Sequence, residues 1–151
     1  MEYRIAAKDD IDILMTARLE TIRKVNGLPD DYQFSNELIE RSKHYFLEGN
    51  QTTVFAVQDG IAVGCASISY IEVMPTLSHP TGKRAHLMNV YTKADYRRKG
   101  IARKLVGMLI DEAKEKGITE ISLDATDLGR ALYESLGFRK SDECMVMNLS
   151  K

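Results

Sequence analysis

The chain has 151 residues, 44% of them hydrophobic and 28% charged, which fits one globular domain (residues 1–151) with a buried core and excludes a disordered polymer. Its 21 basic and 22 acidic residues give a net charge of −1, so no nucleic-acid partner is expected, because nucleic-acid-binding domains carry a basic excess. No apolar run approaches the roughly 20 residues of a membrane span, and residues 1–4 lack the apolar core of a signal peptide. We therefore expect a cytoplasmic protein without membrane contact.

The first half of the chain predicts helices between strands. From the N-terminus the expected elements are a strand at 3–6, a helix at 11–26 capped by Asp9 or Asp10, a helix from Ser35 to about Glu48, and strands at 53–58 and 61–73 joined by the hairpin turn Asp59-Gly60. Residues 74–84 contain two prolines and a glycine and predict a loop.

The second half alternates strands and helices. The expected elements are a strand at 85–92, a helix at 101–116 ended by Gly117, a strand at 120–125, a helix at 128–136 and a last strand at 144–149. Antiparallel hairpins thus come first and a βαβ crossover follows. We predict an α/β (α+β) fold with a single mixed, largely antiparallel central sheet flanked by helices on both faces.

The two cysteines, Cys65 and Cys144, lie far apart in strand-like segments, and the chain has no CxxC motif or Cys/His cluster. We therefore expect no metal site. Two buried free thiols are expected in a reducing cytosol, with a disulfide as the alternative.

A basic turn, Arg97-Arg98-Lys99-Gly100-Ile101-Ala102, joins the strand at 85–92 to the helix at 101–116. The first amides of a helix have no intrahelical partner and carry partial positive charge. No Ser, Thr, Asn or Asp occupies 97–100 to cap them, and Gly100 would let a phosphate approach the backbone closely. The pattern indicates a phosphate site, and a solvated basic turn is the alternative.

This turn carries a family resemblance. Arg97-x-x-Gly100-x-Ala102 resembles the Arg/Gln-x-x-Gly-x-Gly/Ala signature of the GCN5-related N-acetyltransferases, and residues 131–138 (ALYESLGF) resemble the second signature of that family. The resemblance implies acetyl-CoA as co-substrate, with its pyrophosphate on the 97–102 amides and its pantetheine arm between splayed strands. The implied acetyl-CoA-binding residues are Val90, Tyr91, Thr92, Arg97, Arg98, Lys99, Gly100, Ile101, Ala102, Arg130 and Tyr133.

The resemblance also implies candidate catalytic residues. Tyr133 lies beside the apolar stripe of its helix and shares a face with Gly129 and Arg130; the matching family tyrosine protonates the departing thiolate, whereas simple packing against the arm is the alternative. The N–H of Val90 would polarise the thioester carbonyl. For the base, the candidates are His86, Glu72 or a water relay.

The implied reaction is direct attack on acetyl-CoA, within a ternary complex, by a primary amine of a small molecule or peptide; the sequence does not distinguish acetyl from longer acyl donors. The acceptor site is expected in the first two helices, their connecting loop and loop 74–84. The acids there with the charge to attract a cationic amine are Asp30, Asp31, Glu37 and Glu72, and ordinary solvated acids are the alternative. The alternative function is a non-catalytic acyl-CoA-binding sensor. The apolar strand at 144–149 suits the interface of a homodimer. Burial of that strand within the monomer explains its apolar character equally well.

Overall fold

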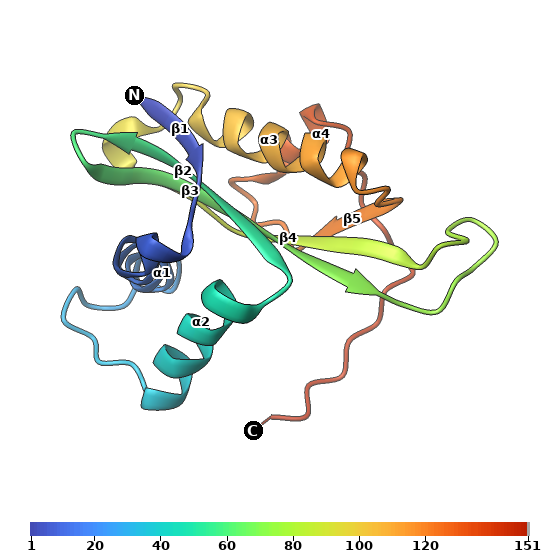
Figure 1. Cartoon of the computed structure of the whole chain (residues 1–151), viewed down its shortest axis with the longest axis horizontal. Helices are drawn as coiled ribbons and strands as arrows, with labels where there is room; N and C mark the ends of the chain where they lie inside the picture. The colour runs from blue at the N-terminus through green and yellow to red at the C-terminus, as the bar shows by residue number, and fades with distance from the viewer. Residues whose placement is uncertain (151) are drawn as a thin grey trace.

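The computed structural model describes residues 1–150, and one five-stranded sheet with the order β1-β2-β3-β4-β5 forms its centre (Figure 1). The strands are β1 (Glu2–Ile5), β2 (Gln51–Gln58), β3 (Ile61–Glu72), β4 (Lys83–Thr92) and β5 (Glu120–Leu123). The first four pair antiparallel, and β5 pairs parallel with β4. The mixed, largely antiparallel sheet expected from the sequence is thereby confirmed.

Helices cover both faces of the sheet, as predicted. α1 (Ile11–Val25) and α2 (Asn36–Glu48) lie on one face, and α3 (Ile101–Glu115) and α4 (Arg130–Ser135) lie toward the other, with short 3₁₀ turns η1 (Lys8–Asp10) and η2 (Ala94–Tyr96) (Figure 1). None of the helices within residues 1–150 is both long enough and apolar enough to cross a bilayer.

Two buried cores hold the layers together because the central strands are apolar on both sides. On the α3 side, Ala66 and Ile68 of β3 pack with Leu105 and Leu109 of α3. On the α1/α2 side, Cys65 of β3 packs with buried residues that include Leu14, Met15, Phe46 and Phe55. Successive side chains of a strand point to opposite faces, so β3 serves both cores.

A close approach fixes the start of α3 on the sheet. Ile101, the first residue of α3, is 3% exposed, and a Cβ at Gly64 of β3 would stand 2.8 Å from its Cγ2 atom. Gly64 therefore makes room for the anchoring side chain of α3, a role that the sequence pattern did not indicate.

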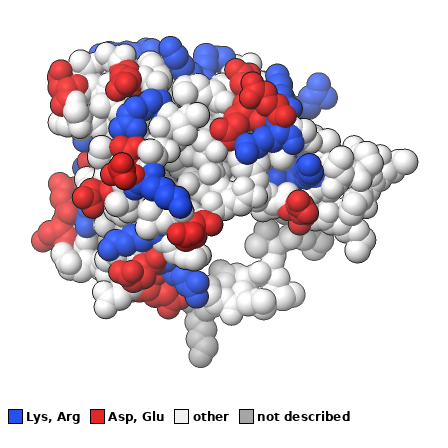
Figure 2. All heavy atoms as spheres, in the orientation of Figure 1, with Lys and Arg blue, Asp and Glu red and all other residues white. Residues whose placement is uncertain are grey.

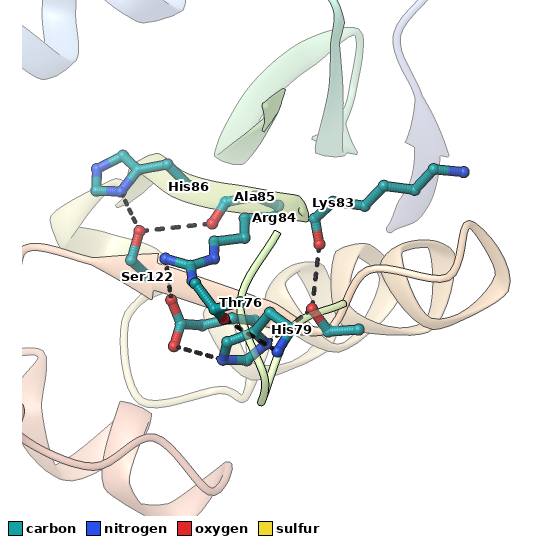
Figure 3. A network of polar contacts seen from close by, with 9 residues as sticks. Thr76, His79, Lys83, Arg84, Ala85, His86 and Ser122 are labelled. Atoms are coloured by element: carbon teal, nitrogen blue, oxygen red, sulfur yellow. Dashed lines mark hydrogen bonds and ion pairs between the residues drawn. The ribbon is translucent and has the colours of Figure 1, made fainter. Parts of the chain in front are cut away.

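The loop between β3 and β4 is fastened to the start of β5. Gly82 adopts a φ of 70°, and a Cβ there would lie 2.1 Å from the carbonyl oxygen of Val73. His79 at the tip contacts Thr119 Oγ1 through Nδ1 at 2.8 Å and Glu120 Oε2 through Nε2 at 3.3 Å (Figure 3). These contacts hold the loop at the first residues of β4, at the end of the strand far from Thr92.

The strand predicted at 144–149 is wrong. Residues 139–150 form no strand or helix, and Met145 and Leu149 are 94% and 90% exposed. The apolar pattern suits a strand, but a strand forms only by pairing, and within residues 1–150 no segment pairs with the outer edge of β5. Cys144 is accordingly exposed and not buried as expected, whereas Cys65 is a buried free thiol.

An ion pair at the entry to α1 generates the first prediction. Arg4 Nη1 lies 2.7 Å from Asp10 Oδ2, and the backbone N–H of Ala7 donates to the same oxygen at 2.7 Å. The Arg4 hydrogen bonds, with that of Ala7, lower the pKa of Asp10 from 3.8 to about 2. The carboxylate therefore stabilises the fold above pH 3.8, and this contribution is lost as pH falls through 2.

We expect Asp10→Asn to lower the free energy of unfolding by about 1–2 kcal/mol at pH 7, since it weakens the ion pair with Arg4 and the hydrogen bond that the Ala7 N–H donates. The difference from the wild type should shrink as pH falls from 4 to 2. Urea unfolding at several pH values measures both effects. Asp9→Asn is the matched control, because Asp9 is exposed and forms no ion pair within residues 1–150; an equal loss at Asp9, or a pH-independent loss at Asp10, would contradict this assignment.

Candidate active site

β4 separates from β5 halfway along its length. β5 pairs with residues 84–87 of β4 only, the last pair being Leu87 with Leu123. β4 nevertheless continues to Thr92, so within the described chain residues 88–92 have no partner on that side. The edge that pantetheine would need is therefore open, as the family resemblance implies.

The separation coincides with a β-bulge at Asn89. The register of β4 against β3 shifts between Met88 and Tyr91, and Asn89 has a φ of 60°. After the bulge, Val90 packs toward the α3 core and Tyr91 toward the α1/α2 core. An extra residue in one strand changes the face of every side chain that follows.

Three side chains hold the bulge in place. Arg18 Nη1 of α1 donates to Asn89 Oδ1 at 3.0 Å, and Asn89 Nδ2 donates to Ser67 Oγ of β3 at 3.1 Å. The thiol of Cys65 donates to the Asn89 carbonyl at 3.3 Å, and burial raises its pKa to about 11, so it remains a neutral donor. Sequence reasoning missed Arg18 and Asn89 because 71 positions separate them.

The turn between η2 and α3 leaves its backbone amides unpaired. Arg98 and Gly100 adopt φ values of 63° and 78°. The first intrahelical bond runs from Lys104 N–H to the Gly100 carbonyl, and no side chain caps the helix. Within residues 1–150 the N–H groups of residues 98–103 therefore have no acceptor. A run of such amides at a helix N-terminus fits phosphate oxygens.

Side chains around this turn also fit a polyanion. Arg97 Nε donates to the Thr92 carbonyl at 2.9 Å, and its guanidinium lies over the Tyr91 ring, while Arg98 and Lys99 are exposed. Thr92 Oγ1 is buried and has no hydrogen-bond partner in the described chain. Buried polar atoms are normally paired, so this hydroxyl fits a polar group of a bound ligand. In Figure 2, Lys and Arg side chains gather along the upper edge, where α3 and this turn lie in Figure 1.

Tyr133 lies on the α3 side of the sheet. Its ring contacts Phe138 edge-on at 5.9 Å and passes so close to Gly129 that a Cβ there would be 2.9 Å from Cε2. Gly129 thus leaves room for the ring, as expected. Burial raises the pKa of Tyr133 above its usual value of 10, so the phenol keeps its proton at neutral pH. Arg130 is exposed and lies 3.7 Å from Asp127.

The two candidate bases lie on opposite faces of the sheet. His86 is opposite Ser69 of β3, whose Oγ is 2.6 Å from the hydroxyl of Tyr45 in α2. Figure 3 shows His86 Nδ1 against Ser122 Oγ, at 2.8 Å, and Nε2 is 3.8 Å from Asp124. Glu72 is exposed and lies two residues after Tyr70 on β3. Tyr70 packs toward the α3 core. Strand alternation therefore places Glu72 away from His86.

A pocket of about 250 Å³ opens between α1, α2 and the bulged part of β4. Its lining residues are Arg18, Leu38, Arg41, Ser42, Tyr45, Phe46, Ser67, Met88 and Asn89. Met88 and Asn89 directly precede the Val90–Thr92 segment, so the pocket adjoins the open edge of β4. The acids suggested by the sequence for an amine site (Asp30, Asp31, Glu37 and Glu72) do not line it.

Comparison with known proteins agrees with this geometry. The sequence profile described as the Acetyltransferase (GNAT) family matches residues 18–138. The chain is 28% identical to human N-acetyltransferase 8 over 116 residues, covering 75% of this chain and 49% of that protein. It is 29% identical to the glucosamine 6-phosphate N-acetyltransferase of Trypanosoma brucei brucei over 102 residues, covering 67% of each. The chain thus spans only about half the length of N-acetyltransferase 8.

A solved structure extends the likeness over nearly the whole chain. It is the crystal structure of a predicted acetyltransferase with acetyl-CoA from Clostridium acetobutylicum, which superposes with a TM-score of 0.86 at 30% identity and covers 98% of this chain and 96% of that one. The profile match spans both the basic turn before α3 and the Tyr133 helix. The chain therefore belongs to the GCN5-related N-acetyltransferase (GNAT) family, whose members are acetyl-CoA-dependent acyltransferases.

Proposed function

We propose that the protein transfers the acetyl group of acetyl-CoA to a primary amine by direct attack within a ternary complex. The observation that carries the proposal is the run of acceptor-less amides at 98–103, which adjoins the open edge of β4. One ligand with a pyrophosphate and an extended, amide-containing arm satisfies both features. The acceptors named for relatives, such as glucosamine 6-phosphate, are amines.

The proposed donor site uses this chain's residues as follows. The amides of the turn formed by Arg97, Arg98, Lys99, Gly100, Ile101 and Ala102 bind the pyrophosphate, and Arg130 contacts a phosphate or the carbonyls of the arm. Val90, Tyr91 and Thr92 bind the arm, with the unpaired Thr92 hydroxyl as one contact. Bound acetyl-CoA supplies an activated thioester.

Three groups of the chain then act on the reacting atoms. The N–H of Val90 donates to the thioester oxygen as negative charge develops there. His86, on the same face as the pocket, takes the proton that the attacking amine loses. Tyr133, which burial keeps protonated, gives its proton to the departing sulfur. Glu72, on the opposite face from the pocket, is the weaker candidate for the base.

Two glycine substitutions test the donor site, one at Gly100, the N-cap of α3, and one at Gly107 within the helix. Gly100→Ala should weaken acetyl-CoA binding at least tenfold, because alanine resists the φ of 78° that aims the amides. Gly107 is in the interior of the same helix with open space around it. Gly107→Ala should leave binding unchanged and stabilise the helix by up to about 1 kcal/mol.

Calorimetric titration with acetyl-CoA measures both variants, and ATP serves as the control polyanion. Unchanged affinity in Gly100→Ala, or equal binding of ATP by the wild type, would remove the turn as the donor site. Binding of acetyl-CoA without thiol release across a broad amine panel would instead favour the alternative function, a non-catalytic acyl-CoA sensor.

The role of Tyr133 predicts a separation of kinetic constants. We expect Tyr133→Phe to lower kcat at least tenfold while the KM for acetyl-CoA changes little, since general acid catalysis typically contributes about 10²–10⁴-fold. Steady-state thiol release measures both constants. Tyr3→Phe is the control, because Tyr3 is on β1, where its ring lies under Lys104 of α3 and away from α4. An unchanged kcat in Tyr133→Phe would show that the ring only packs.

The choice of base predicts a pH signature. His86→Gln should lower kcat/KM and remove the acid limb of its pH profile, since glutamine accepts no proton. Glu72→Gln, on the opposite face, should lower kcat/KM less. Profiles of thiol release between pH 5.5 and 9 measure the two variants side by side. An acid limb that persists in His86→Gln would point to a water relay, and its loss only in Glu72→Gln would transfer the role to Glu72.

A further inference from the structure

The pocket between α1, α2 and β4 carries positive charge without a balancing acid. Arg18 and Arg41 line it, and its other polar lining groups, Ser42, Tyr45, Ser67 and Asn89, are neutral. Within residues 1–150, no carboxylate lies within 4.0 Å of either guanidinium. A pocket shaped only to hold a cationic amine would favour the opposite sign of charge.

Arg18 has no acidic partner in the described chain. It is half-buried, and its one hydrogen-bond partner in the described chain is the neutral amide oxygen of Asn89. Burial lowers its pKa below the usual value of 12.5, although a guanidinium stays charged at neutral pH. Arg4 and Lys93, beside α1, pair with Asp10 and with Glu20 of α1. Arg23 of α1 also bonds a neutral group, the Tyr32 carbonyl, but it lies outside the pocket. A buried charge without a counter-ion is costly, so a ligand anion at Arg18 would satisfy a site that the fold leaves open.

The position of Arg18 ties this anion to the acceptor. Its Nη1 atom contacts the side chain of Asn89, the residue directly before Val90, whose N–H is the proposed oxyanion donor. An acceptor amine that reaches the thioester at Val90 therefore has its remaining atoms beside Arg18. Leu38, Phe46 and Met88 make the rest of the pocket apolar. At about 250 Å³, it is just below the usual range for small-molecule sites, about 300–1,000 Å³.

We propose that the acetyl acceptor is a small amine that also carries an oxyanion, a carboxylate or a phosphate, which Arg18 and Arg41 bind while an apolar portion contacts Leu38, Phe46 and Met88. This inference rests on the proposed acetyl transfer. An α-amino acid with an apolar side chain meets these requirements, because its carboxylate is one carbon from its amine. The N-terminal amine of a peptide does not, because its α-carboxyl is an amide.

The activity test compares pairs of acceptors in which one member carries an anionic group that the other lacks. One pair is L-leucine and L-leucinamide, and the other is glucosamine 6-phosphate and glucosamine. Leucinamide is the less basic amine, so a larger fraction of it is unprotonated at pH 7, and a preference for leucine cannot come from amine basicity. We expect kcat/KM to favour the anionic member of at least one pair about 10–100-fold, the range for charge-assisted hydrogen bonds. The pair that responds identifies carboxylate or phosphate as the anion.

Variants then assign the preference to the two arginines. Arg18→Met and Arg41→Met should each reduce the anionic preference, the ratio of kcat/KM for the anionic member to kcat/KM for the neutral member, at least tenfold. Arg41 is exposed on α2 and forms no hydrogen bond in the described chain, so its variant keeps the test valid should loss of Arg18 disturb the bulge. Lys43→Met is the control, because Lys43 is exposed on the same helix outside the pocket. Equal use of neutral and anionic acceptors, or a preference that survives in both arginine variants, would overturn the proposal.

A binding measurement separates this proposal from the acetyl transfer itself. The Nε–H resonance of Arg18, assigned from its absence in Arg18→Met, is followed by NMR during titration with 4-methylpentanoate, its neutral amide and inorganic phosphate. We expect an anion to shift this resonance and the neutral amide to leave it unchanged. No shift with either anion would overturn the anion site even in an active enzyme. A shift in a protein that releases no thiol with any amine would support the anion site and refute the transferase function.

Discussion

The left-handed backbone of Asn89 is the constraint on which the arrangement of the site depends. A φ of 60° costs a non-glycine residue roughly 1–2 kcal/mol, and contacts from α1 and β3 offset it. Arg18, Ser67 and Cys65 each bond a different atom of Asn89. Asparagine suits the position, because its short amide side chain tolerates the left-handed region and can accept from Arg18 while it donates to Ser67.

The bulge places the proposed acid, Tyr133, and the proposed base, His86, on opposite faces of β4. Pairing with β5 ends two residues before Asn89, which opens the strand edge for the donor. Val90 then turns toward the α3 side, where Tyr133 packs, whereas Met88 and Asn89 line the pocket on the α1/α2 side. In the proposed reaction, the group that protonates the leaving sulfur and the group that deprotonates the amine therefore approach from opposite sides of one strand and do not compete for the same space.

Features set by local sequence were predictable, and features set by contacts across the chain were not. The strand–turn–helix around Gly100 follows from neighbouring residues, so this unit and its basic turn were expected, and the structure has them. The bulge depends on the hydrogen bond from Arg18. In the sequence, however, Arg18 is one of the polar residues of an ordinary amphipathic helix, and nothing marks it as a partner of Asn89. The strand expected at 144–149 does not form, which shows the same limit: alternating apolar residues are typical of a strand, but only pairing with another strand makes one, and local sequence does not report that pairing.

The first turn of α3 and the pocket around Arg18 both carry positive charge without an acidic partner among the described residues, and they lie at the two proposed substrates. The first turn of α3 has no acidic residue, although cations there oppose the helix dipole by about 0.3–1 kcal/mol each. The anchoring of Ile101 against Gly64 stabilises the helix start in spite of this repulsion. On the opposite face of β4, Arg18 retains a guanidinium whose only bonded partner in the described chain is the neutral side chain of Asn89. An acid at either place would stabilise the fold and occupy the position of a substrate anion, so the lower stability is a direct consequence of keeping both positions open.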